Sequence, residues 1–280
     1  MAKSRDESHY LHGTEPGEQD RLSRLNDLLN EQSLQEMNLC PGDKVLDVGS
    51  GLGQLSRGIA RKVGPGCVIG VERSDDQLAQ ARRLASQAVE DGAVDFRQGE
   101  AGRLPLRDDE WGTFDVAHAR FVLEHVPDPL AVVRGMVRAV RAGGRIILED
   151  DSHDTFRLWP EPPGLAALWR CYIRSYDRAG NDPLVGHRLV QLLHQAGAVP
   201  QRNTWLFFGA CAGQQELLGA YVDNVVGILQ GVREAILDVG EIEPAFFDET
   251  IAGLRRWGER PDAALWYATS WAEGRSSDAH

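Results

Sequence analysis

The 280-residue chain is 42% hydrophobic and 26% charged, a composition that can build a large core and is typical of a globular protein. No apolar run approaches the roughly 18 residues of a membrane span, and the polar amino-terminal segment lacks a signal-peptide core, so we expect a cytoplasmic protein. The net charge of −12 argues against broad electrostatic capture of nucleic acid or of an anionic membrane. The four cysteines form no CxxC pair, which argues against a structural zinc site.

The first half of the chain alternates between helical and strand patterns. Leucines at spacings of three and four predict a helix over residues 17–38. Strands follow at 44–49, 68–72, 94–98, 113–119 and 145–149, and helices at 54–63, 75–90 and 129–140. Ser74 or Asp75 is the expected N-cap of the helix that begins near residue 75. Five strands that alternate with helices predict a parallel sheet with helices on both faces.

Residues 151–280 are richer in aromatic side chains. Helices are predicted over 163–178, 186–196, 213–238 and 244–257, and strands over 202–209 and 264–272. We interpret this half as the last two strands of the sheet with helical cap insertions. The predicted fold class is therefore α/β, with a doubly wound, mostly parallel, seven-stranded sheet. We expect a single domain over residues 1–280, made of an amino-terminal helical segment (1–40), a core (41–150) and a cap with the last strands (151–280).

A glycine-rich turn, VLDVGSGLGQ at residues 45–54, follows the first predicted strand. Gly49, Gly51 and Gly53 let the backbone turn tightly and approach a ligand closely. The helix behind them presents free N–H donors at the carboxyl end of a parallel strand, which is the usual ligand crevice of such sheets. The dinucleotide fingerprint GxGxxG would need its third glycine at Gln54, so the spacing argues against an NAD-linked enzyme.

This turn resembles motif I of the class I S-adenosylmethionine (SAM)-dependent methyltransferases, (V/L)LD(V/L)GxGxG, with Asp47 as its acid. Further landmarks resemble the family in the correct order: Glu72 at the end of the second strand, GEA at 99–101, FDVAHARFVLEHVPD at 114–128 and RAGGR at 141–145. The likeness runs over residues 43–149. It implies a Rossmann-like fold with SAM as cofactor. It departs from the family at Ser50, where many members have cysteine, and at Glu100, where aspartate is commoner.

The resemblance also implies which residues meet the cofactor. In the family, the motif I acid orders the loop and the methionine end, the second acid accepts hydrogen bonds from the ribose, and the G(D/E)A segment contacts adenine. An early YLHGT segment resembles a pre-motif whose aromatic residue closes over the cofactor carboxylate, and a residue at the Arg120 position either contacts the cofactor through its backbone or pairs with an acid. The implied cofactor-binding residues are Tyr10, Asp47, Gly49, Ser50, Gly51, Gln54, Glu72, Arg73, Gln77, Glu100, Ala101 and Arg120.

Two histidines are the candidate catalytic residues. His153 lies in EDDSHD at 149–154, just past the fifth strand, where an acid–histidine cluster could act as a general base or hold a metal. A solvated loop is the plainer interpretation of the same residues. His125 either packs at a helix start or lines the cofactor pocket. We assign His153 first and His125 second, and we assign no metal.

These patterns predict a SAM-dependent methyltransferase that transfers a methyl group to an O, N or C atom of a small-molecule acceptor, in secondary metabolism. Aromatic residues of the second half form either a hydrophobic acceptor pocket or ordinary core. Two alternatives stay open: a SAM-binding protein with other chemistry such as cyclisation, and a protein or RNA methyltransferase. The latter would need a basic stripe, through Arg134, Arg138, Arg141 and Arg145. We expect no nucleic-acid partner and no membrane, and we leave a homodimer open.

Overall fold

The structure is a computed structural model that describes residues 27–277, apart from the side chains of residues 177–179. The chain divides into two compact units. Of the described residues, the sheet unit comprises 29–155, 180–207 and 268–277, and the helical unit comprises 27–28, 156–179 and 208–267. The predicted helix over 17–38 is described from residue 27 to residue 36, and its earlier part, like Tyr10, lies outside the described residues.

The sheet unit is built on parallel strands with the order β3-β2-β1-β4-β5, followed by β8. Asp47 of β1 lies between Gly70 of β2 and His118 of β4, which places the first strand at the centre of the sheet. Strand β8 runs antiparallel to its neighbour β5. The strands are β1 (Val45–Val48), β2 (Val68–Glu72), β3 (Val94–Gln98), β4 (Phe114–Arg120), β5 (Val140–Asp151) and β8 (Ala264–Ser276).

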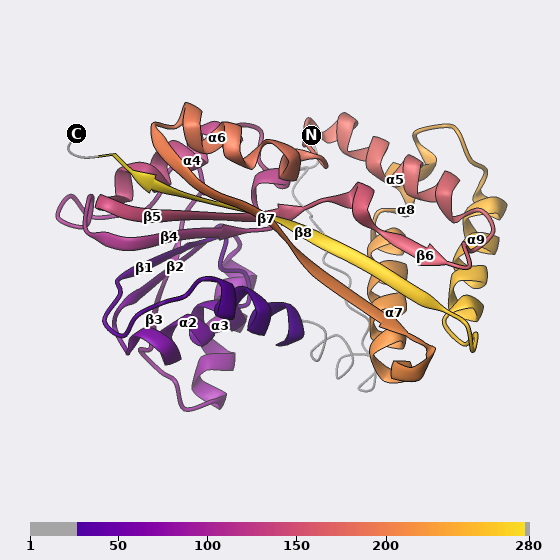
Figure 1. The fold of residues 1–280 in the computed structure, drawn as a ribbon, viewed down its shortest axis with the longest axis horizontal. Helices are drawn as coiled ribbons and strands as arrows, with labels where there is room; N and C mark the ends of the chain where they lie inside the picture. The colour runs from indigo at the N-terminus through magenta and orange to yellow at the C-terminus, as the bar shows by residue number, and fades with distance from the viewer. Residues whose placement is uncertain (1–26, 278–280) are drawn as a thin grey trace, which may run out of the picture. The chain divides into compact units, whose positions relative to one another are not determined.

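Helices cover both faces of these strands, as predicted. Helices α2 (Gln54–Val63) and α3 (Asp75–Gln87) lie on one face, and α4 (Pro129–Ala139) and α6 (Leu189–Gln195) on the other (Figure 1). The core between sheet and helices is apolar and closed to solvent, because β1, β2 and β4 are buried almost throughout. Ser74 caps α3 by accepting a hydrogen bond from the amide of Gln77 (3.3 Å), so the predicted cap is confirmed.

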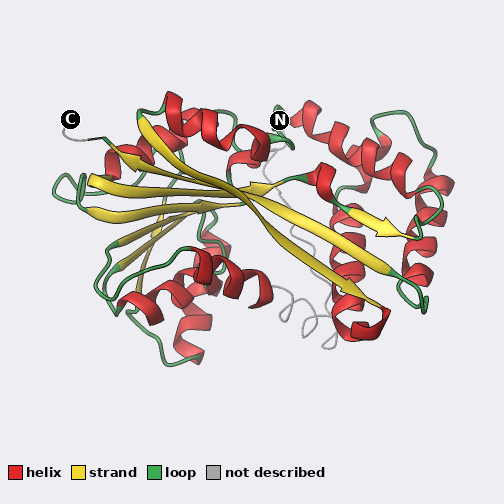
Figure 2. Ribbon diagram, viewed as in Figure 1, coloured by secondary structure: helices red, strands yellow, loops and turns green. Residues whose placement is uncertain are grey.

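The helical unit packs α5 (Leu165–Ala179), α7 (Gln215–Gly231), α8 (Arg233–Leu237) and α9 (Pro244–Trp257) against one another (Figure 2). The short strand β6 (Arg157–Trp159) pairs with the first residues of β8. Strand β7 (Ala198–Cys211) pairs with β8, and both strands contribute residues to each unit. Leu168, Leu218 and Phe247 are fully or almost fully buried. Within residues 27–277, every helix is too short or too polar to cross a membrane.

The sheet has eight strands, so the prediction of seven was one short. The extra strand, β6, has three residues, and its only signal is its pairing with β8, which no local periodicity reveals. Strand β5 begins at Val140 and not at residue 145, because Gly143 and Gly144 form a bulge inside it, where the register with β4 shifts. The predicted helix 186–196 divides into η3 (Val185–Arg188) and α6. The predicted helix 213–238 divides into η4 (Ala212–Gln214), α7 and α8, with Val232 between the last two.

A buried ion pair fastens the loop that enters β4. The guanidinium of Arg97 on β3 donates two hydrogen bonds to Glu110, at 2.6 and 2.8 Å, and the amide of Arg107 donates a third at 2.8 Å. The hydrogen bonds from Arg97 outweigh the effect of burial and lower the pKa of Glu110 to about 2. A carboxyl whose pKa falls on folding stabilises the folded state at neutral pH and loses that contribution as the pH drops towards the folded pKa.

We therefore expect Glu110→Gln to lower the free energy of unfolding by roughly 2–3 kcal/mol at pH 7. The difference from wild type should shrink between pH 4.5 and pH 2, the window between the two pKa values. Urea denaturation at a series of pH values measures it. Asp109→Asn, at the exposed neighbouring acid, is the matched control and should change little. A pH-independent gap for Glu110→Gln would contradict the pKa assignment.

Candidate active site

Three glycines with positive φ shape the turn between β1 and α2: Gly49 (76°), Gly51 (52°) and Gly53 (70°). The amides of Gly49 and Ser50 both donate to the carbonyl of Val71, which ties the turn to β2 (2.8 and 2.9 Å). A Cβ on Gly49 would lie 2.2 Å from Cγ2 of Val122. Only glycine fits there, so the turn presents bare backbone at the carboxyl end of the central strand.

Asp47, the acid of the turn motif, is buried and faces the protein interior. One carboxylate oxygen accepts from Oγ of Ser56 at the start of α2 (2.5 Å), and the other pairs with Nδ1 of His118 on β4 (2.9 Å). Asp47 therefore ties strand, turn and helix together. Sequence reasoning missed His118, although a polar residue in an apolar strand run (VAHA) is a signal that could have found it.

Glu72 lies where the second strand ends and holds the glycine turn directly. Its carboxylate accepts from the amide of Gly51 (3.1 Å) and from the amide of Ser74 (2.9 Å). Oε1 of Gln77 lies next to Gly51, 3.3 Å from where a Cβ would stand. The structure thus brings three predicted cofactor residues, Gly51, Glu72 and Gln77, into one group at the sheet edge.

The remaining predicted cofactor residues lie around this group with different exposure. Gln54 is the first residue of α2, and the amide of Gly99 donates to the carbonyl of Glu72 (3.0 Å), which brings Glu100 and Ala101 to the same edge. Glu100 and Arg73 are exposed. Oγ of Ser50 is buried with no hydrogen-bond partner among the described residues. A bare backbone cradle with an acid beside it fits the methionine and ribose parts of SAM.

Arg120 uses its side chain to hold the amino-terminal helix, residues 27–36. Its guanidinium donates to Oδ1 of Asn30 (2.5 Å) and to Oγ of Ser33 (3.1 Å). Ser33 in turn donates to the buried carboxylate of Glu149 on β5 (2.7 Å). Within residues 27–277 the guanidinium of Arg120 contacts neutral side chains in place of an acid, and a backbone contact with the cofactor stays a prediction.

His153 is buried, so the interpretation of its segment as a solvated loop was wrong for this residue. It lies in η2 (His153–Thr155), and its Nε2 is 2.9 Å from Oε2 of Glu124, which lies in η1 (Leu123–His125) at the end of β4. Oδ2 of Asp151 is 3.9 Å from the same nitrogen. Burial alone would lower the pKa of His153, but Asp151, Glu124 and Asp154 outweigh it and raise the pKa above its usual value.

His125 follows Glu124 but points outward, with 44% of its side chain exposed, and its Nε2 is 3.3 Å from Oε1 of Glu124. This exposure disagrees with a packed histidine at a helix start, and a place in the lining of the cofactor pocket stays a prediction. Glu124, Asp151 and His153 each offer one ligand atom, and these atoms lie within 4.8 Å of one another, a spacing that would also admit a divalent ion. The short contact between Glu124 and His153 is that of a hydrogen-bonded dyad.

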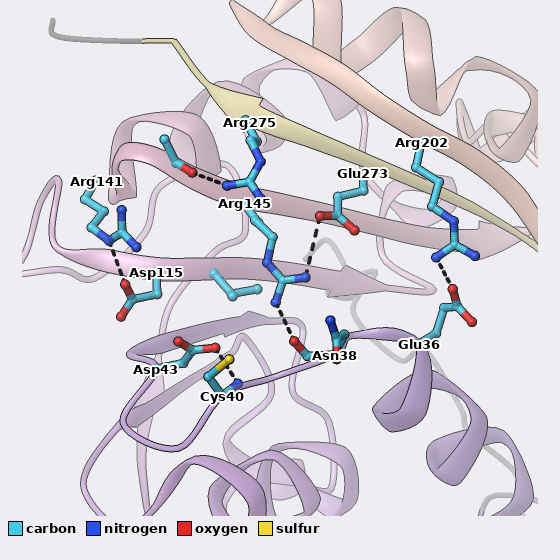
Figure 3. Close-up of a pocket in the computed structure, with 12 residues that line it drawn as sticks. Glu36, Asn38, Cys40, Asp43, Asp115, Arg141, Arg145, Arg202, Glu273 and Arg275 are labelled. Carbon is cyan, nitrogen blue, oxygen red and sulfur yellow. Dashed lines mark hydrogen bonds and ion pairs between the residues drawn. The ribbon is translucent and has the colours of Figure 1, made fainter.

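A hollow of about 410 Å³ lies at the opposite, amino-terminal ends of the parallel strands (Figure 3). Its charges largely compensate one another: Arg141 binds Asp115 (2.6 Å), Arg145 lies 3.5 Å from Glu273, and Arg202 pairs with Glu36. Arg141 and Arg145 are members of the suspected basic stripe, and a third member, Arg138, stacks on Trp111. Two of the four arginines of that stripe, Arg141 and Arg145, are thus each close to a carboxylate.

The aromatic residues of the second half differ in burial. Tyr172, Phe208 and Tyr221 are buried core residues. Trp205 and Phe207 of β7 are 49% and 67% exposed, and Trp159 is 67% exposed. An acceptor pocket built from the exposed members stays a prediction.

The fold and this site define a protein that binds a nucleoside-containing ligand on a glycine turn, with a histidine–carboxylate dyad at the carboxyl ends of β4 and β5. A family model described as "Methyltransferase domain" matches residues 39–180. The chain belongs to the class I SAM-dependent methyltransferases.

Three relatives illustrate the range of similarity. The methyltransferase GfsG of Streptomyces halstedii is 37% identical over 146 residues, 52% of this chain and 51% of that protein, so the chain spans about half of its length. The 27-O-demethylrifamycin SV methyltransferase of Amycolatopsis mediterranei is 33% identical over 252 residues, 89% of this chain and 85% of that protein. The geranyl diphosphate C-methyltransferase structure from Streptomyces coelicolor A3(2) has a TM-score of 0.55 at 13% identity, with 94% and 85% of the chains covered.

Proposed function

We propose that the protein transfers the methyl group of SAM to a small-molecule acceptor, with a hydroxyl as the methylated group. The single observation that carries the proposal is the glycine turn, held by Glu72 through the amide of Gly51 and too tight at Gly49 for any side chain. The 27-O-demethylrifamycin SV methyltransferase, whose name states a small-molecule acceptor, supports the acceptor class. A function in secondary metabolism agrees with the rifamycin relative.

SAM supplies a methyl group that its sulfonium already activates, so the protein has to bind, orient and deprotonate the acceptor. Glu124 is hydrogen-bonded to Nε2 of His153 and orients the imidazole that would take the proton of an acceptor hydroxyl. Glu124 also stabilises the imidazolium that results. We propose His153 as this base, with the more exposed His125 as the second candidate.

Calorimetric titration with SAM and with S-adenosylhomocysteine tests the cofactor site. Incubation with SAM, 27-O-demethylrifamycin SV and a panel of hydroxylated polyketides and quinols then tests the reaction, with formation of S-adenosylhomocysteine and a methylated product as readout. Consumption of an acceptor without S-adenosylhomocysteine would favour cyclisation or another reaction. Dependence on added Mg²⁺ or loss of activity in EDTA would favour an ion in place of the base. Light scattering of the same sample tests for a homodimer.

Glu72→Ala is expected to weaken SAM binding about 10- to 100-fold, because the turn loses two hydrogen bonds to a carboxylate and the ribose loses its acceptor. Glu72→Gln, which keeps one acceptor oxygen, should fall in between. Glu259→Ala removes the same charge from an exposed position in the helical unit and should bind like wild type. Calorimetry on the four proteins measures this order, and wild-type affinity in Glu72→Ala would remove Glu72 from the site.

A further inference from the structure

A second buried carboxylate, Asp150, lies near Glu124 of the Glu124–His153 dyad. Asp150 is completely buried on β5. Its Oδ2 accepts from the amides of Val122 (3.3 Å) and Leu123 (2.9 Å), and its Oδ1 accepts from the amide of Asp151 (3.1 Å). Such a carboxyl is costly to bury, and burial followed by the nearby charges of Glu124 and Asp151 raises its pKa.

The two amides that Oδ2 of Asp150 binds lie at the start of the short helix η1, which carries Glu124. This helix has no side-chain cap of its own, since Val122 stands at its N-cap position. The chain enters it through Phe121, whose φ of 55° is unusual for a residue that is not glycine. A single turn with a strained entrance and no local cap needs an outside partner to keep its geometry. Asp150 is that partner.

We propose that Asp150 is a positioning residue, which holds the backbone of residues 122 and 123 and thereby keeps the carboxylate of Glu124 against the imidazole of His153. Its importance for turnover rests on the proposed function. The positioning itself is a property of the free protein and is measurable without any acceptor.

The proposal is tested by measuring the pKa of His153 by NMR, from its imidazole signals over a series of pH values. Glu124, Asp151 and Asp154 are the charged groups that raise this pKa, and His125 shares the carboxylate of Glu124. We expect the pKa to fall in Asp150→Ala to the value found in Glu124→Gln. Asp150→Asn, which keeps one oxygen for the amides of η1, should fall less and serves if the alanine variant does not fold.

A double mutant separates positioning from a direct charge effect. If Asp150 acts through Glu124, Asp150→Ala should have no effect on the pKa of His153 in the Glu124→Gln background. An equal fall in both backgrounds would show that Asp150 acts through its own charge or through Asp151, and would overturn the proposal. An unchanged pKa in folded Asp150→Ala or Asp150→Asn would overturn it too.

The matched control is Asp128→Ala, which removes the N-cap of α4 (Asp128 Oδ1 to the Ala131 amide, 3.0 Å) a few residues further along. This variant also removes a carboxylate that caps a helix, but it should leave the pKa of His153 unchanged. With an acceptor in hand, Asp150→Ala should reduce kcat about tenfold or more, as Glu124→Gln does, while SAM affinity stays within about twofold of wild type. A parallel loss of SAM affinity would mean that Asp150 only supports the fold. If no methylation is found, the proposed function is wrong, but the NMR result on positioning remains valid.

Discussion

Gly49→Ala is expected to abolish measurable SAM binding, with a loss of at least about 100-fold. A methyl group at this position would stand 2.2 Å from Cγ2 of Val122, which is far inside contact distance, on a backbone with φ of 76°. Val122 is the residue before η1 and is buried, so it has little room to retreat. The turn must open to relieve the overlap. Its amides would then lose the hydrogen bonds to Glu72 and to the carbonyl of Val71 that orient them.

The matched control for that variant is Gly66→Ala. Gly66 has nearly the same φ, 79°, but an added Cβ would meet nothing within 4 Å. Both variants carry the left-handed strain of about 1–2 kcal/mol, and only Gly49→Ala adds the overlap. Chemical denaturation and calorimetry should therefore show a moderate stability loss in both proteins and a binding loss in one. Equal SAM affinity in the two variants would mean that the turn does not form the cofactor site.

His153→Asn is expected to reduce kcat by about 10²- to 10⁴-fold, the range typical of a missing general base, with SAM affinity unchanged. His187→Asn is the matched control, since His187 is an exposed histidine bonded to Asp154 (3.0 Å) in the same unit. His125→Asn should give a smaller loss than His153→Asn. The opposite order would exchange the two proposed roles.

The pH dependence of kcat should reveal that the pKa of His153 is raised. Because Asp151, Glu124 and Asp154 raise the pKa of His153, its basic form is reached only at a pH above that of an ordinary histidine. We expect kcat to rise with pH through this raised pKa. In Glu124→Gln the imidazolium loses its partner, so the rise should move to lower pH while the maximal rate drops. A limb that moves to higher pH in that variant would contradict a dyad between Glu124 and His153.

Much of the fold could be predicted because its signals are local. The bounds of α2, β2, β3 and α9 agree with the sequence-based expectation, since glycines, prolines and apolar strand runs mark them along the chain itself. The three-residue β6 and the bulge at Gly143 could not be predicted, because both depend on the strand that lies alongside.

The candidate site could also be predicted only in part. Gly49, Gly51 and Glu72 were implied by the resemblance to the family, and the structure joins Gly51 to Glu72. The direction of Asp47 into the protein and its contact with His118 were missed, because the two residues are 71 positions apart. Glu124 was part of a recognised stretch but had no role assigned, and Asp150 had none at all.

The sequence by itself determined the order of strands and helices, the glycine turn at the end of β1 and the family to which the chain belongs, since each depends on residues a few positions apart. Only the tertiary structure decided that Glu124 meets His153, that Asp150 caps a helix from another strand, and that His153 is buried. These contacts join residues about 30 positions apart through the pairing of β4 with β5, and burial and charge at such a place depend on what the neighbouring strands bring to it.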